Sequence, residues 1–166
     1  NSGSIYSIDK DFNVTNHINE IGISNTFTWS PNNEKFYFTD TLTGIIDVYD
    51  YNYNENKILN KKEFAKFDRG YPDGSTVDSE GFLWSCRWNG SCVARFDPNG
   101  KLDYVIELPV PNVTSCTFGG SDLKTLFITT ARMGMTQEEL NNKPLAGSVF
   151  AYNSSIKGKP DFKFGS

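Results

Sequence analysis

Three oxygen-bearing side chains, those of Asn25, Asp73 and Thr114, occupy matching positions in three similar runs of this 166-residue sequence. In each unit the run is followed by a turn cluster, then by an apolar segment, and then by a segment that opens with glycine. An amide oxygen, a carboxylate and a hydroxyl are hard donors, which suit calcium or magnesium better than a soft metal. If the fold brings the three positions together, the sequence predicts a divalent cation site there.

The repeated unit also predicts the elements that must position these side chains. The first strand of the three units is expected at residues 24–29, 72–77 and 113–118, the second at 35–39, 82–85 and 125–129, and the third at 44–49, 90–96 and 147–152. All-β repeats of roughly 40 to 45 residues indicate the blades of a β-propeller. Because the first strand of a blade lines the central channel, the three oxygen donors are expected to point at one axial site.

The ends of the chain predict an incomplete ring. Residues 3–9 read as the third strand of a blade whose outer strand begins at 13–15, further outer strands are expected near 61–67 and 102–108, and 161–165 reads as a short extra strand. A capping box at residues 136–139, closed by Pro144, predicts a short helix between the second and third strands of the last unit. About three and a half blades do not close, since propellers need at least four. We therefore expect the chain to belong to a longer protein or to assemble with a second copy.

Composition narrows the class of protein. The net charge of −4 and the absence of a basic stripe argue against nucleic acid and anionic membranes as partners. No apolar run is long enough to span a membrane and the first residues lack a signal-peptide pattern, which predicts a soluble, cytoplasmic protein. The odd count of three cysteines, at positions 86, 92 and 116, without metal-type spacing, predicts buried free thiols.

Four segments carry a resemblance to a known family. They are GISN at 22–25, PDG at 72–74, VARFDPNGK at 93–101 and TSCTFGG at 114–120. With these motifs the chain resembles the regucalcin, gluconolactonase and luciferin-regenerating-enzyme family, from about residue 3 to the end. The resemblance implies a six-bladed propeller with one divalent cation in its channel, in which residues 1–166 form the carboxy-terminal part of a single domain.

The same resemblance implies roles for individual residues. Asn25 and Asp73 match two of the family's three metal ligands, whereas the third, a glutamate, has no counterpart in this chain. The implied cation is calcium or zinc, with magnesium or manganese as alternatives. Asp73 would also be the catalytic general base in hydrolysis of a small sugar-derived lactone. Thr114 is a candidate channel-lining, substrate-binding group.

Other interpretations remain open at this point. Asn before a strand and Pro-Asp-Gly are both ordinary turn signals, so the two residues could be structural. The protein could be a calcium-binding regulatory protein of the regucalcin type without turnover, or an inactive fragment. The family usually has glycine where this chain has Thr26, a side chain that would narrow the pocket or add a hydroxyl.

Overall fold

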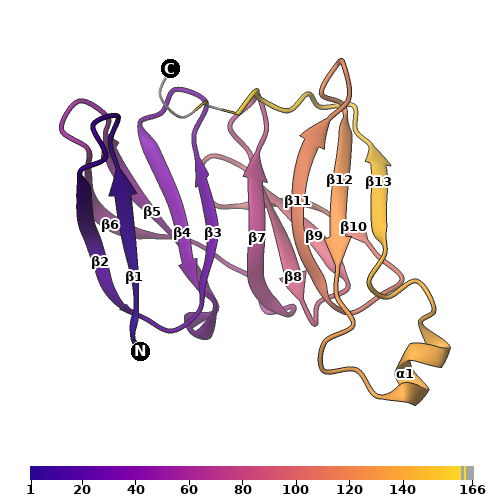
Figure 1. Cartoon of the computed structure of the whole chain (residues 1–166). Helices are drawn as coiled ribbons and strands as arrows, with labels where there is room; N and C mark the ends of the chain where they lie inside the picture. The colour runs from indigo at the N-terminus through magenta and orange to yellow at the C-terminus, as the bar shows by residue number, and fades with distance from the viewer. Residues whose placement is uncertain (162, 164–166) are drawn as a thin grey trace.

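The computed structural model describes residues 1–161 and 163, which form four antiparallel sheets standing side by side (Figure 1). The first sheet pairs β1 (Gly3–Ile8) with β2 (Val14–Ile21). The second contains β3 (Ser24–Trp29), β4 (Lys35–Asp40), β5 (Ile45–Asn52) and β6 (Lys57–Lys66). The third contains β7 (Tyr71–Val77), β8 (Leu83–Trp88), β9 (Cys92–Phe96) and β10 (Leu102–Glu107), and the fourth β11 (Val113–Gly119), β12 (Thr125–Thr130) and β13 (Val149–Asn153).

Each sheet joins only strands that follow one another in the sequence, as the blades of a propeller do. The first strands β3, β7 and β11 are neighbours in space, with β7 in the middle. The expected all-β propeller architecture, with about three and a half blades in this chain, is therefore confirmed. The inner strands of three successive blades meet along one side of the molecule.

The hydrophobic core lies between successive sheets rather than within one centre. Each pair of neighbouring sheets encloses one cluster of buried apolar side chains. Fully buried Phe36 lies between the first and second sheets, Val77 between the second and third, and Trp84 between the third and fourth. Strands β8 and β9 are buried almost throughout, because the third sheet is covered on both faces. Burying each such large apolar side chain stabilises the fold by roughly 1.5–3 kcal/mol.

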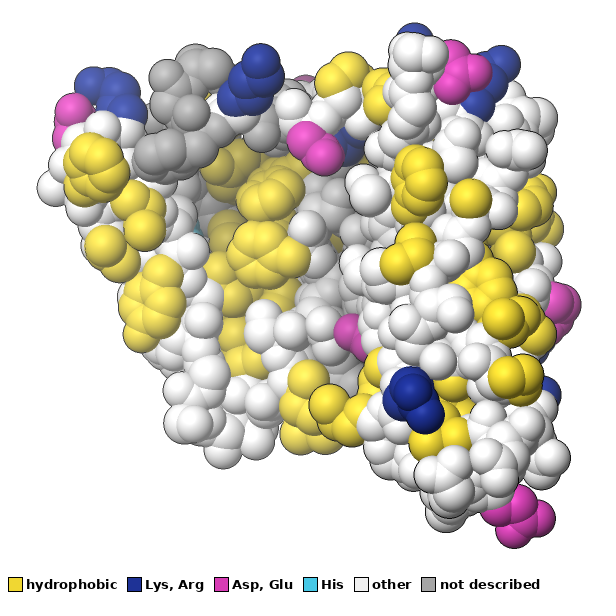
Figure 2. All heavy atoms as spheres, turned by 45° about the vertical axis from the view of Figure 1, so that its right-hand side comes forward, with side chains coloured by type: hydrophobic (Ala, Val, Ile, Leu, Met, Phe, Trp, Pro, Cys, Tyr) yellow, Lys and Arg dark blue, Asp and Glu magenta, His cyan; other side chains and the backbone are white. Residues whose placement is uncertain are grey.

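The two-stranded first sheet leaves its neighbour partly uncovered. Tyr6, Ile8 and Val14 of that sheet are exposed, and Phe27 in β3 is 47% exposed although its ring packs on Trp29. Figure 2 shows hydrophobic side chains along the left-hand side and in the hollowed centre of this face. Apolar surface of this kind is normally covered by further structure.

The predicted short helix is α1 (Gln137–Asn142), which begins with the capping box of Thr136 and Glu139. It lies between β12 and β13, at the lower end of the molecule in Figure 1. None of its residues is buried, so it is a surface helix. Across residues 1–161 and 163, no helix is long and apolar enough to cross a membrane.

Local differences from the sequence-based expectations are small. The outer strand expected near residue 61 begins at Lys57, and a 3-10 turn, η1 (Thr41–Thr43), was not predicted. The strand expected at 161–165 lies largely outside the described residues. Cys86, Cys92 and Cys116 are buried free thiols, as predicted.

Candidate functional site

A β-bulge interrupts each of the three inner strands near the predicted site. The pairing register shifts between Asn25 and Thr28 in β3, and between Pro72 and Ser75 in β7. In β11 it shifts between Val113 and Ser115. A bulge leaves backbone groups without ladder partners and re-aims the local side chains. The three bulges therefore mark one structural level shared by neighbouring blades, and the residues predicted to carry chemistry lie at this level.

Asn25 is half-buried in β3, and its amide Nδ2 donates a 2.8 Å hydrogen bond to the hydroxyl of Thr41. Its Oδ1 accepts no hydrogen bond from any residue that the structure describes. Thr41 opens η1, which Asp40 caps by accepting from the N–H of Leu42. An amide oxygen without a protein donor is available to a ligand.

Asp40 also anchors the chain that enters β3. Its carboxylate accepts hydrogen bonds from the N–H groups of Gly22 and Ile23, at 2.8 and 2.9 Å. Burial alone would raise the pKa of Asp40, but these bonds and the one from Leu42 outweigh it and hold the pKa below its ordinary value. Asp40 is therefore a fixed anion that positions Thr41 and the start of β3.

Asp73 lies in the bulge of β7 and is the least satisfied carboxylate of this region. Burial raises its pKa to about 6, and the N–H of Gly74 only partly offsets that effect. Within residues 1–161 and 163, no cationic side chain pairs with this carboxylate. Two residues further along, the hydroxyl of Ser75 is buried without a partner among the same residues. A half-buried acid of this kind is stabilised by a cation or by a proton.

Two threonine hydroxyls join β3 and η1 to the bulge of β7. Thr41 donates to the carbonyl of Pro72 and Thr26 donates to the carbonyl of Asp73, both at 2.8 Å. Thr26 is 1% exposed and has a φ of 47°, a left-handed conformation that favours glycine. These bonds bring the predicted ligands Asn25 and Asp73 to adjoining positions on two blades.

Thr114 lies at the same level in β11, but its hydroxyl already has a partner. It shares a 2.7 Å hydrogen bond with the hydroxyl of Thr129 on β12. The backbone of β11 passes close to Gly74, where an added Cβ would lie 2.8 Å from the carbonyl oxygen of Thr114 and 2.4 Å from the hydroxyl of Ser115. Glycine at position 74 is therefore required for the close approach of β7 and β11.

Arg87 is a buried residue of this region that the sequence did not single out. It is 1% exposed and donates to the carbonyls of Phe67, Arg69 and Gly70, on the segment that leads into β7. Burial lowers its pKa to about 10. In the sequence, the only indication of this role is a positively charged residue within the apolar segment that forms β8. That pattern indicates that Arg87 has a buried hydrogen-bond partner, but it does not identify the partner.

The residues present fit a hard divalent cation as part of a ligand set. Among the described residues, Asn25 Oδ1 accepts no hydrogen bond and the Asp73 carboxylate accepts only from the N–H of Gly74, so both oxygen donors, on adjoining blades, are open to a cation. No group of three acidic, histidine or cysteine side chains suited to a metal occurs within residues 1–161 and 163. Two protein ligands make a weak site by themselves, so the remaining coordination would have to come from elsewhere.

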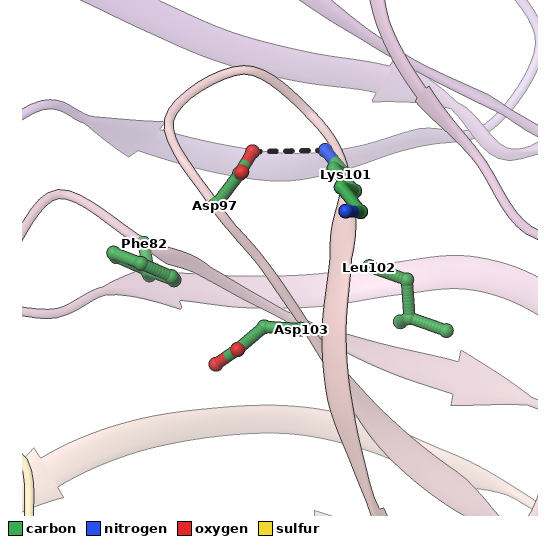
Figure 3. Close-up of a pocket in the computed structure, with 5 residues that line it drawn as sticks. All are labelled: Phe82, Asp97, Lys101, Leu102 and Asp103. Atoms are coloured by element: carbon green, nitrogen blue, oxygen red, sulfur yellow. Dashed lines mark hydrogen bonds between the residues drawn. The ribbon is translucent and has the colours of Figure 1, made fainter.

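A hollow lined by two carboxylates lies away from the inner strands (Figure 3), with a volume of about 310 Å³. Its lining residues are Phe82, Asp97, Lys101, Leu102 and Asp103. Asp97 accepts from the backbone N–H of Lys101, the bond drawn in the figure, and Asp103 accepts from Arg95. Both carboxylates therefore already have hydrogen-bond donors from the protein beyond an adjacent backbone N–H, in contrast to Asp73.

Comparison with known proteins identifies the family. The family model described as "SMP-30/Gluconolactonase/LRE-like region" matches residues 1–132. The chain belongs to this family. A regucalcin from Gallus gallus is 37% identical over 166 residues, which cover 98% of this chain and 56% of that protein.

Two solved structures share the fold over most of the chain. A luciferin-regenerating enzyme superposes with a TM-score of 0.90 at 30% identity, covering 98% of this chain and 55% of the enzyme. A regucalcin from Agrobacterium tumefaciens, described as a calcium-binding protein, gives a TM-score of 0.88 at 28% identity and covers 94% of this chain and 54% of its own. The chain therefore spans about half the length of the relatives it matches.

Proposed function

We propose that this chain contributes to a metal-dependent lactonase that opens small sugar-derived lactones, with Asn25 and Asp73 as two ligands of its cation. The observation that carries the proposal is a pair of oxygen donors on adjoining inner strands that no cationic side chain among the described residues neutralises, Asn25 Oδ1 and the Asp73 carboxylate. Membership of a family named for gluconolactonase supplies the substrate class. In this proposal residues 1–166 are the carboxy-terminal part of one propeller domain, and its cation is calcium or zinc.

Each residue has a defined role in the proposed hydrolysis. A bound divalent cation would supply electrophilic activation of the ester carbonyl and of water. The Asp73 carboxylate, which pairs with no cationic side chain among the described residues, accepts a proton from the attacking water as the C–O bond to the carbonyl carbon forms. The same carboxyl group returns the proton to the ring oxygen as the ring C–O bond breaks, giving the hydroxy acid. Asn25 orients the site without adding charge, and Thr114 lines the substrate side.

The test is hydrolysis of glucono-δ-lactone by the purified full-length propeller that contains this chain, with calcium or zinc added. Asp73→Asn should lower kcat/KM by about 10²-fold or more, the usual contribution of a general base. Asp97→Asn is the matched control, because Asp97 caps a turn away from the inner strands. Equal activity of wild type and Asp73→Asn in the presence of either cation would refute the proposal.

A calcium-binding protein without turnover is the second candidate. It is favoured by the oxygen-only donor pair and by the description of the Agrobacterium tumefaciens relative as a calcium-binding protein. Calcium binding that depends on Asp73, together with no lactone hydrolysis by the same sample, would select this candidate over the lactonase.

A further inference from the structure

The bulge in β7 leaves backbone carbonyl groups on both sides of the Asp73 side chain without strand partners. The ladder pairing between β7 and β8 is interrupted from Pro72 to Ser75, so the carbonyls of Pro72 and Asp73 lose regular strand partners. Carbonyl groups that are not exposed to water need another donor. Both donors come from the preceding blade: Thr41 bonds the carbonyl of Pro72, and Thr26 bonds that of Asp73. The two peptide groups that flank the Asp73 side chain are thus fixed by hydrogen bonds from the neighbouring blade, and not by the strands of their own sheet.

The single hydroxyl hydrogen of Thr41 determines the orientation of the Asn25 side-chain amide. A threonine hydroxyl has one hydrogen, and a carbonyl oxygen can only accept. Because Thr41 gives its hydrogen to the carbonyl of Pro72, it can only accept from the group on its other side. That group is the Asn25 amide, at 2.8 Å, so Nδ2 must face Thr41 and Oδ1 must face away. The choice between the two ends of the amide follows from the chemistry of its neighbours.

We propose that Thr41 is a positioning residue of the cation site: its hydroxyl presents Asn25 Oδ1 to the cation and at the same time fixes the peptide plane that precedes Asp73. This inference rests on the proposed function, because it assigns Oδ1 to a bound cation. The relay from Asn25 Nδ2 through Thr41 to the Pro72 carbonyl joins two ligands on different blades through one side chain. Groups that orient ligands in this way typically contribute 10–100-fold to metal affinity.

The test compares Thr41→Val, which keeps the shape and removes the hydroxyl, with Thr41→Ser, which keeps the hydroxyl. Thr43→Val is the matched control, since the Thr43 hydroxyl bonds the carbonyl of Asp40 in the same turn and does not contact Asn25. Calorimetric titration of the purified protein with calcium and with zinc should show a ten- to hundredfold weaker affinity for Thr41→Val. Thr41→Ser should stay within about threefold of wild type, as should Thr43→Val. Equal affinities for wild type and Thr41→Val, or an equal loss in Thr43→Val, would overturn the proposal.

A second measurement separates this inference from the proposed function. In the cation-free protein, hydrogen exchange of the Asn25 side-chain amide, identified by its loss in Asn25→Asp, reports the bond to Thr41 directly. We expect slow exchange in wild type and Thr41→Ser, and faster exchange in Thr41→Val. Absence of cation binding by the wild type would refute the proposed function and leave this readout to decide the relay. Equal exchange rates in all three proteins would refute the relay.

Discussion

Asp73 within β7 and Asp78 directly after that strand are two carboxylates with contrasting surroundings. Asp78 is 0% exposed, yet its oxygens accept from the backbone N–H of Glu80 and Phe82, from the indole of Trp84 and from the guanidinium of Arg95. Asp73 is half-buried and, within the part of the chain that the structure describes, accepts only from the N–H of Gly74, so burial raises its pKa to about 6. Complete satisfaction of Asp78 makes it structural, whereas the deficit at Asp73 leaves a charge that a ligand can use.

The surroundings of Arg95 explain why Asp78 tolerates complete burial. The Arg95 side chain is 5% exposed, lies 3.7 Å above the ring of Phe82, and also pairs with Glu80 and Asp103. A buried ion pair whose hydrogen bonds are all made costs much to break, because the remaining partner stays buried and unpaired. Among residues 1–161 and 163 no comparable network surrounds Asp73, so the two carboxylates should respond to substitution in opposite directions.

The largest expected effect is the loss of Asp78. Asp78→Ala should lower the free energy of unfolding by about 3–5 kcal/mol or prevent folding, because it removes the fully buried acceptor of Arg95 and of the Trp84 indole together with the cap of the turn. Urea denaturation followed by tryptophan fluorescence measures this. Asp97→Ala is the control, since Asp97 caps the same kind of turn, at Asn99 and Lys101, without an arginine partner. The control should lose on the order of 1 kcal/mol; equal losses would contradict the assigned role of the ion pair.

The second-largest expected effect is a gain in stability on substitution of Asp73. In cation-free protein above pH 7, Asp73→Asn should raise the free energy of unfolding by on the order of 1 kcal/mol, because it removes a poorly solvated charge. The pKa of Asp73 is about 6 in the fold against an ordinary value of 3.8, so between these values the folded state holds more protons. Wild-type stability therefore rises relative to the variant as pH falls from about 6 to about 4. Denaturation curves at several pH values test this, and a gap between the two proteins that does not depend on pH would contradict it.

The smallest effect is expected at Thr26. Thr26→Gly relieves a φ of 47° but loses the hydrogen bond to the Asp73 carbonyl, two effects of about 1 kcal/mol each that nearly cancel. Thr26→Val also loses the bond but keeps the strain, so it should be the less stable of the two variants by about 1 kcal/mol. Thermal unfolding of the three proteins makes the comparison. If Thr26→Gly were the less stable variant, packing of the threonine side chain would outweigh the strain.

The sequence was sufficient to predict the strands and the family because these depend on local patterns. The repeated runs around Asn25, Asp73 and Thr114 fall on β3, β7 and β11. The alternation of apolar and polar residues and the choice of turn residues depend on only a few neighbouring positions, so both can be recognised in a single sequence. The roles of these three residues as ligands or catalytic groups remain predictions.

The contacts that distinguish the site could not be predicted in the same way. Thr41 and Arg87 act on segments of a neighbouring strand or loop, and their partners are backbone carbonyls, which leave no residue-type signature. The departure at Thr26 was visible in the sequence, but its positive φ and its bond to Asp73 depend on how two blades meet. Asp73 and Asp78 both lie beside turn residues and differ only in what tertiary structure places around them.

The local pairing of the sheets also bears on the order of folding. Every sheet joins consecutive strands, so most of the backbone pairing has low contact order and should form early. The bonds from Thr26 to Asp73 and from Thr41 to Pro72 span 47 and 31 residues and can form only after two blades have docked. A cation added during refolding would consequently encounter its proposed ligands together only at the end of the pathway. Its uptake would report the docking of finished blades rather than the formation of any one of them.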